Sequence, residues 1–280
     1  MTARAALIVA IPAFLARAVA AQEHIDWIVT DFPPGHILSG DQAGTGIVDL
    51  EIRYLSAQMT DFTHSTRQAP NIRAWALVKE RDGICVADAL DLPERRQFAL
   101  YSRHAGLAVL APQLLVRRDQ AARFDGFRNA AGEIDLQALG ADSSLRAART
   151  SDRPLGAVIE QFSSGAGQTQ LASLPRPGLA VAMLDKGHID YAFGYANEIT
   201  YYRAVHPDST EMTAIPVAGQ PRIFYPRIAC SDGPVGRRAI ARVDEILGRA
   251  GTPPPYFEAT GRWYAADDFR ELSAKADWPK

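Results

Sequence analysis

Hydrophobic positions in the first part of the chain follow strand and helix periods in turn. Ile25, Trp27 and Val29 alternate with polar neighbours, which predicts a strand, and we expect Trp27 in the core. Further on, apolar residues recur at helical spacing, and a proline opens the second helical segment. The expected elements are a strand over 24–32, a helix over 45–59, a strand over 62–66, a helix over 70–83 and a strand over 84–90. This β-α-β-α-β order predicts an α/β domain with a mostly parallel sheet.

The alternation continues towards the C-terminus. An extended segment over 106–119 is followed by segments that predict strands over 144–150, 189–196, 212–219 and 222–231, and helices over 135–140, 154–164, 178–187, 197–205, 234–251 and 254–264. The sequence has no convincing internal repeat. Two α/β lobes of roughly 100 residues each account for the length better than one very large sheet.

The first 21 residues have the layout of a secretory signal peptide. Arg4 precedes an apolar stretch over 6–16, and small residues follow at 18–20. The apolar stretch is too short to span a bilayer and contains Pro12. We therefore expect residues 1–21 to be removed and the mature protein to lie in the periplasm. The alternative is a buried N-terminal helix.

Charge and cysteine content narrow the function classes. With 30 basic against 32 acidic residues and no basic run, the chain has no electrostatic reason to bind nucleic acid. The six histidines show no HxH or HExxH spacing, so we expect neither a metal nor a cofactor. In an oxidising compartment, Cys85 and Cys230 are candidates for one long-range disulfide, and the alternative is two separate buried thiols.

Several short motifs occur in an order that matches a known family. Gly46 and Asp49 stand at the start of the helix that follows the first strand. Residues 92–95 read Leu-Pro-Glu-Arg, an aromatic-Ser pair follows at 101–102, and residues 182–202 run as helix, glycine, strand and helix. With these motifs the chain resembles bacterial extracellular solute-binding proteins of the amino-acid-binding type (family 3), in a divergent proteobacterial branch whose ligand is unassigned.

The resemblance implies a two-lobed α/β fold of the type II periplasmic-binding-protein class. Each lobe would be a mixed, mostly parallel sheet flanked by helices, and a hinge would let the lobes close on a ligand. The chain would cross between the lobes near 112–118 and again near 222–228. Lobe 1 would then comprise residues 22–115 and 225–280, and lobe 2 residues 116–224. This division places both cysteines in lobe 1, in agreement with the disulfide.

Arg95 is the first candidate binding residue. In the family the corresponding arginine receives the ligand's carboxylate, and a planar guanidinium suits this task because it forms two parallel charge-assisted hydrogen bonds. The alternative is a solvated turn, which we expect for Arg96. Leu92 stands where the family has a threonine whose hydroxyl helps to bind the carboxylate, so the chain departs from the family at this position.

The amino-group side of the family's site departs as well. The family has an aspartate near the end of the second-lobe strand, whereas this chain has Tyr195, and Asp190 matches the aspartate that opens the strand. Glu198 could supply the missing charge, or could simply be an acid at a helix start. Tyr195 is either a hydroxyl of the cleft or a strand-end aromatic. An organic anion or a neutral solute therefore fits at least as well as an α-amino acid.

Three further residues are candidate walls of the cleft. Phe32 follows the first strand, where the cleft should open. Thr150 and Ser151 end a strand ahead of a helix, where hydroxyls and backbone amides can cradle an anion. The alternative role for both hydroxyl residues is to cap that helix.

The resemblance implies a monomeric binding protein that captures a small solute and delivers it to an inner-membrane ABC permease. The alternative is a ligand-sensing or partner-binding module that signals to a periplasmic sensor domain. We expect no enzymatic activity, because the sequence has no GxSxG elbow, no metal spacing and no Cys–His pair suited to catalysis.

Overall fold

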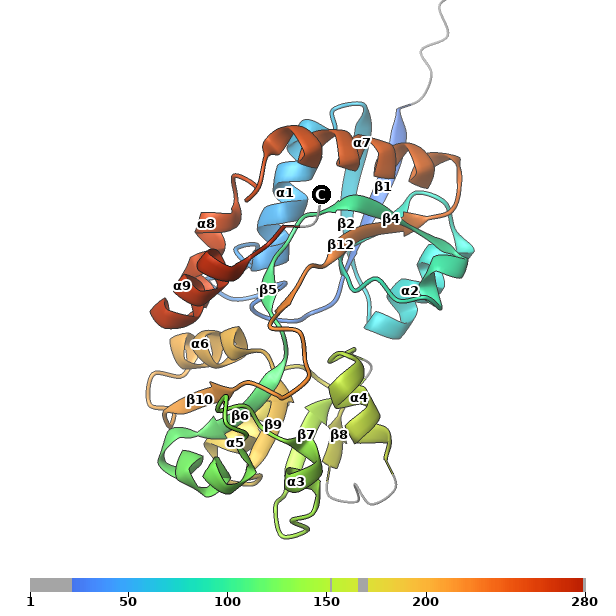
Figure 1. Cartoon of the computed structure of the whole chain (residues 1–280). Helices are drawn as coiled ribbons and strands as arrows, with labels where there is room; N and C mark the ends of the chain where they lie inside the picture. The colour runs from blue at the N-terminus through green and yellow to red at the C-terminus, as the bar shows by residue number, and fades with distance from the viewer. Residues whose placement is uncertain (1–21, 152, 166–170, 279–280) are drawn as a thin grey trace, which may run out of the picture.

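The computed structural model describes residues 22–151, 153–165 and 171–278, which form two α/β lobes joined by two crossing segments (Figure 1). The predicted signal peptide over 1–21 lies outside the described residues. In the described part of the chain, every helix is too short or too polar to cross a bilayer.

The first lobe contains a five-stranded sheet in the order β2-β1-β3-β12-β4. Its strands are β1 (Glu23–Val29), β2 (Phe62–Gln68), β3 (Ile84–Ala89), β4 (Ala99–Ala105) and β12 (Arg227–Ser231). β1 runs parallel to β2 and β3, whereas β12 runs antiparallel to β3 and β4. The last strand of the lobe therefore returns from the far end of the chain and completes a sheet that the N-terminal segment began.

Helices cover both faces of this sheet. Trp27, 1% exposed, packs into the core with residues of α1 (Ile47–Gln58) and α7 (Pro234–Ala250). Its neighbour Ile28 packs on the opposite face with residues of α2 (Asn71–Glu80). Successive residues of a strand point to opposite faces, so β1 is buried on both sides. The prediction that Trp27 belongs to the core is confirmed.

The second lobe contains a five-stranded sheet in the order β10-β6-β9-β7-β8. Its strands are β6 (Gln113–Arg117), β7 (Ala147–Thr150), β8 (Leu171–Leu174), β9 (Tyr191–Gly194) and β10 (Met212–Ile215). The pairing of β7 with β8 and β9 is parallel, and that of β6 with β9 and β10 is antiparallel. The helical segments of this lobe are η2 (Arg118–Phe127), α3 (Leu136–Gly140), α4 (Ala157–Ser164), α5 (Leu179–Asp185) and α6 (Ala196–Val205).

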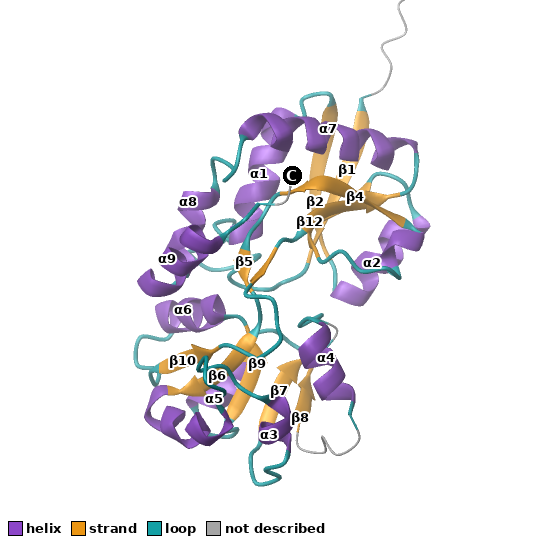
Figure 2. Ribbon diagram, viewed as in Figure 1, coloured by secondary structure: helices purple, strands orange, loops and turns teal. Residues whose placement is uncertain are grey.

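Two adjacent segments carry the chain between the lobes (Figure 2). β5 (Val109–Leu110) pairs antiparallel with β11 (Ile223–Phe224), and the N–H of Ala111 donates to the carbonyl of Arg222 at 3.0 Å. The outgoing and returning chains therefore pass through one narrow hinge. The predicted domain boundaries at 115/116 and 224/225 lie close to this pair of strands and stay a prediction.

The C-terminal segment packs along the hinge and touches both lobes. It contains α8 (Phe257–Thr260), η3 (Gly261–Trp263) and α9 (Ala266–Lys275), and α9 was not anticipated from the sequence. Trp263 contacts Tyr201 of α6 with ring centroids 5.5 Å apart. Arg222, beside β11, donates to Glu271 of α9 at 2.6 Å. The segment thus ties the first lobe, the hinge and the second lobe together.

Cys85 and Cys230 form the expected disulfide. They lie directly opposite each other on β3 and β12, with Cα atoms 4.1 Å apart, and both are fully buried. The bond links positions separated by 145 residues, and the segment between the two cysteines contains the whole second lobe. It therefore fixes the point at which the returning chain rejoins the first sheet.

Removing the disulfide should lower stability strongly. Closing a loop of this length contributes up to about 5 kcal/mol in the chain-entropy model. We expect the Cys85→Ala, Cys230→Ala double variant to unfold at lower urea concentration than the oxidised protein, and reductant to shift only the unsubstituted protein. Equal urea midpoints for the oxidised protein and the variant would contradict this expectation.

Candidate ligand-binding cleft

A cavity with a volume of about 910 Å³ lies between the two lobes. Residues that follow the carboxyl ends of strands form much of its wall. Thr30, Asp31 and Phe32 follow β1, and Tyr195 follows β9. In open α/β sheets this edge is where ligands bind, because loops of several strands meet there. The volume lies in the range of small-molecule sites.

The loop that carries Phe32 is held by the Gly46 and Asp49 motif. The Asp49 carboxylate accepts hydrogen bonds from the backbone N–H groups of Gly46 and Ile37, each at 3.0 Å, and from His36 Nδ1 at 2.7 Å. Burial alone would raise the pKa of Asp49, but the bond and charge of His36 and these N–H groups lower it. A Cβ atom at Gly46 would lie 2.3 Å from the carbonyl oxygen of Gly35, so only glycine fits there. The motif therefore shapes the cleft wall.

Arg95 lines the cavity from the first lobe, at the start of the short helix η1 (Arg95–Gln97). Its guanidinium carbon lies 3.9 Å from the ring centroid of Trp75, and burial lowers its pKa. The neighbouring Tyr101 hydroxyl opposes this lowering of the pKa. Among the described residues no carboxylate lies within ion-pair distance of Arg95. A guanidinium has five N–H donors, so Arg95 can still receive an anion.

Arg96, the next residue, is used differently. Its side chain is 60% exposed and forms an ion pair with Asp91, with Nε donating to Oδ1 at 2.6 Å. It does not line the cavity. Leu92 does not line the cavity either, and contributes through its carbonyl, which accepts the N–H groups of Arg95 at 3.0 Å and Arg96 at 3.3 Å. Leu92 thus shapes the turn that presents Arg95, and the family's threonine hydroxyl has no replacement here.

Thr150 and Ser151 line the cavity from the second lobe, but they do not cap a helix. α4 begins at Ala157, and its N-cap is Gly156 with a φ of 91°, so the alternative role of capping this helix is wrong. The hydroxyl of Ser151 donates to the carbonyl of Leu174 at 3.0 Å, and its N–H donates to the same oxygen at 2.8 Å. Ser151 is therefore tied to β8, and the hydroxyl of Thr150 is the more available of the two.

Tyr195 and Glu198 sit at the start of α6 and also line the cavity. Oε1 of Glu198 accepts the N–H of Tyr195 at 3.3 Å, which is the helix-start role that the sequence left open. The same oxygen accepts a hydrogen bond from Arg153 Nη1 at 2.8 Å. Burial raises the pKa of Glu198, and the charge of Arg153 opposes that rise. Glu198 is thus both a cap and one half of a buried ion pair.

Arg153 also joins the two lobes. Its guanidinium carbon lies 2.9 Å from the ring centroid of Phe32 in the first lobe and 4.1 Å from that of Tyr195 in the second. The Phe32 and Tyr195 rings themselves are 6.3 Å apart. A guanidinium over aromatic faces is attracted by their π electrons. The predicted wall residues Phe32, Tyr195 and Glu198 are therefore brought together by an arginine that sequence reasoning missed.

Asp88 is a second residue that the sequence analysis missed. It is half-buried at the end of β3 and lines the cavity, and its charge partly opposes the lowering of the Arg95 pKa by burial. The available signal was an aspartate inside an otherwise apolar strand segment. For Arg153 the signal was weaker, because nothing in the sequence indicates that a residue after β7 will face Glu198, 45 positions away.

No family model matches the chain, and no curated protein is similar to it in sequence. Solved structures are similar in fold. One is a histidine kinase sensor domain that resembles periplasmic binding proteins, with 16% identity, coverage of 92% of this chain and 98% of that one, and a TM-score of 0.60. A second is an ancestral amino acid-binding protein, a precursor of cyclohexadienyl dehydratase, with 14% identity, 86% and 96% coverage and a TM-score of 0.61.

A third similar structure is an amino acid ABC transporter substrate-binding protein from Streptococcus pneumoniae bound to L-arginine. It has 14% identity, coverage of 90% of this chain and 94% of that one, and a TM-score of 0.59. Together these comparisons confirm the predicted fold: a two-lobed, type II periplasmic-binding-protein architecture of mixed sheets flanked by helices. At such low identity the likeness concerns the fold alone.

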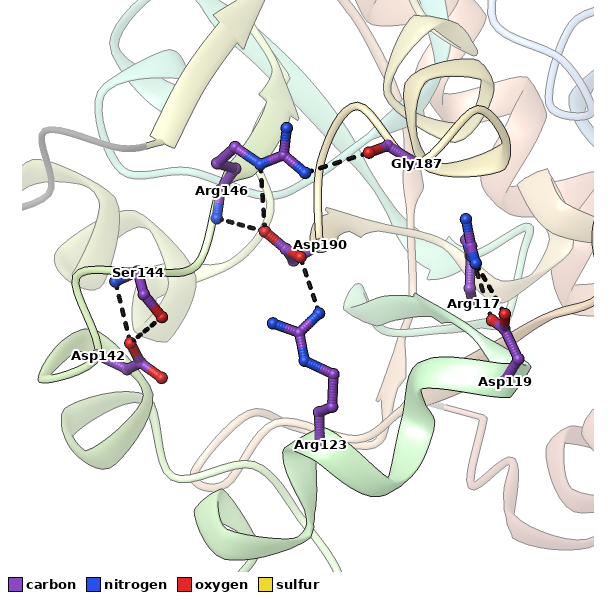
Figure 3. Close-up of polar contacts among 8 residues, drawn as sticks. All are labelled: Arg117, Asp119, Arg123, Asp142, Ser144, Arg146, Gly187 and Asp190. Carbon is purple, nitrogen blue, oxygen red and sulfur yellow. Dashed lines mark hydrogen bonds and ion pairs between the residues drawn. The ribbon is translucent and has the colours of Figure 1, made fainter.

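Asp190 lies away from the cavity and has a structural role (Figure 3). Its carboxylate accepts Arg123 Nη1 at 2.9 Å and the backbone N–H of Arg146 at 2.8 Å, with Arg146 Nε at 3.4 Å. These contacts join η2, the segment before β7 and the segment before β9. Burial alone would raise the pKa of Asp190, but these hydrogen bonds and charges lower it.

The Asp190→Asn variant should lose stability in a pH-dependent way. Because the folded-state pKa of Asp190 is lowered, its contribution is complete above the unfolded pKa of about 4 and is lost as pH falls through the folded pKa. We expect a loss of about 1–3 kcal/mol at neutral pH that shrinks below about pH 4, measured by urea unfolding.

Asp119→Asn is the matched control. Asp119 pairs with Arg117 in the same lobe (Figure 3), but its side chain is 54% exposed. Exposed ion pairs contribute little, so we expect no measurable change in the free energy of unfolding. A loss for Asp190→Asn that stays constant down to pH 3 would contradict the structural role given to its charge.

Proposed function

We propose that this protein binds a small carboxylate-bearing solute in the cleft between its lobes, with Arg95 as the residue that receives the carboxylate. The observation that supports this most directly is the state of Arg95. It is half-buried against Trp75, faces the cavity and has no ion-pair partner among the described residues. A partly desolvated guanidinium with unused donors gains most from a planar anion, because two parallel charge-assisted bonds can form.

The two-lobed arrangement supports capture by closure. Walls from both lobes contribute to one cavity, and two paired segments carry the chain between the lobes. A solute that contacts both walls stabilises the closed arrangement, since the hinge absorbs the change. On this proposal Phe32 contributes from the first lobe, and Thr150, Ser151 and Tyr195 from the second, while no residue acts in catalysis.

We place the protein in the periplasm as a monomer that delivers its solute to an inner-membrane ABC permease. The comparisons with substrate-binding proteins of amino acid transporters support transport. A ligand-sensing role is the second candidate, because a histidine kinase sensor domain is matched over 98% of its own length. Deletion of the gene separates the two: uptake of the solute is lost if the protein serves transport, and is kept if it serves sensing.

The Arg95→Ala variant should lose most of its affinity for the solute. Each hydrogen bond to a charged group contributes about 1.5–3 kcal/mol, which corresponds to about 10- to 150-fold in the dissociation constant. The measurement is a thermal-shift screen of amino acids, dicarboxylates, aromatic acids and sugars, followed by calorimetric titration of each hit.

Arg96→Ala is the control for this experiment. It removes the same charge one residue further along, from an exposed side chain outside the cavity. We expect its affinity to stay within about twofold of the unsubstituted protein, since exposed charges contribute little. A solute that binds Arg95→Ala and the unsubstituted protein equally well would overturn the role given to Arg95, and the absence of any hit would count against the proposed function.

A further inference from the structure

Among the described residues of the second lobe, Glu198 is the carboxylate that a positively charged group of a solute would meet in the cleft. It lines the cavity wall, and its side chain is only 7% exposed. A carboxylate at such a place attracts a cation strongly, because little water screens it. In this protein, however, the position beside Glu198 is already filled by the guanidinium of Arg153 at 2.8 Å.

Arg153 is held in that position from three sides. Glu198 accepts its hydrogen bond, the Tyr195 ring lies beneath it in the same lobe, and the Phe32 ring covers it from the other lobe. Its side chain is 17% exposed. A solute ammonium that displaced Arg153 would leave a buried guanidinium without its counter-charge, which is strongly unfavourable.

Arg176 and His206 also line the second-lobe wall, and the other described residues there offer mostly neutral groups. Thr150, Ser151, Tyr195 and Asn197 line it alongside the Arg153–Glu198 pair, and aromatic rings of Tyr201 and Tyr202 extend it. In the first lobe Asp31 and Asp88 also line the cavity. Asp31 is exposed to solvent, and the negative charge of Asp88 is partly offset by Arg95. Arg95 is half-buried, whereas Arg176 is exposed, so we assign carboxylate recognition to Arg95. The remainder of the solute meets mostly hydroxyl, amide and aromatic surface.

We propose that Arg153 is a built-in cation of the cleft that occupies the subsite of Glu198, so that the protein selects carboxylates without an ammonium group. This inference rests on the proposed function and narrows its solute class to organic acids with an uncharged aliphatic or aromatic remainder. Arg153 is thus a specificity-determining residue: its side chain takes the place that the cationic part of an amino acid would need.

Matched pairs of acids test this selectivity. 3-Phenylpropionate, 4-methylpentanoate and glutarate differ from L-phenylalanine, L-leucine and L-glutamate only by the α-ammonium group. We expect the protein to bind at least one acid and to prefer it at least tenfold over its amino counterpart in calorimetric titration. A preference for the amino counterpart, through Glu198 or through Asp88, would overturn the proposal.

Substitution of Arg153 should change the preference. Arg153→Ala and Arg153→Met, which keeps an apolar stem between the two rings, both free Glu198 to bind a cation. We expect each folded variant to lose the tenfold preference or to favour the amino counterpart, and Glu198→Gln added to either should prevent that gain. Arg149→Ala is the matched control, since Arg149 forms a similar pair with Glu160 at 2.7 Å outside the cavity. A preference unchanged in both Arg153 variants would overturn the proposal.

A second measurement reports on the subsite without any solute. Millimolar methylguanidinium should raise the melting temperature of Arg153→Ala, because the ion can take the vacated place beside Glu198. It should not raise the melting temperature of the unsubstituted protein or of the Arg153→Ala, Glu198→Gln double variant. If none of the acids binds, the proposed function and the solute class fail together. A rise in the melting temperature of Arg153→Ala with methylguanidinium would still support the role of Arg153. If methylguanidinium leaves that melting temperature unchanged, the role of Arg153 is overturned as well.

Discussion

The structure depends on one topological constraint: the chain leaves the first lobe and returns to it through the same narrow place. β5 and β11 pair there, so the second lobe is inserted between two strands that lie side by side. Because the returning chain enters the first sheet as β12 beside β3, the carboxyl ends of the strands in both lobes are held facing one cavity. The Cys85–Cys230 bond reinforces this point of return, since it joins β3 to β12 directly. The cleft exists because the strand ends of the two lobes face each other across it.

The cleft itself contrasts two arginines that face it from opposite lobes. Arg95 lies flat on Trp75 and keeps its donors unused by any described carboxylate, whereas Arg153 is paired with Glu198 and covered by two rings. Both are partly desolvated cations, but only the first is in a state to gain from a new anion. The same residue type can therefore serve recognition in one wall and fixed charge compensation in the other, and the local counter-charge makes the difference.

The contact between Arg153 and Phe32 gives the cleft a further property. It crosses from one lobe to the other, so part of the interlobe attraction comes from the protein's own side chains. The C-terminal segment adds a second connection, because Trp263 packs against Tyr201 and Glu271 pairs with Arg222 at the hinge. A hinge with such contacts on two sides holds its lobes near each other before a solute arrives, and the solute then contributes the remaining stabilisation.

The sequence by itself indicated most of the elements, the disulfide as one of two alternatives, and the place of the carboxylate-binding candidate. Alternating and helical periods predicted most of the strands and helices but not β4, β8 or α9, and the Leu-Pro-Glu-Arg motif with its following aromatic pointed to Arg95 through the family resemblance. These features can be predicted from the sequence because they are local or depend on the residue spacing within a motif. Only the tertiary structure decided that Leu92 acts through its carbonyl, and that Arg153 meets Glu198 and Phe32. These contacts depend on which strand ends face one another across the cleft. The periodicity of the sequence does not show which distant residues meet in space.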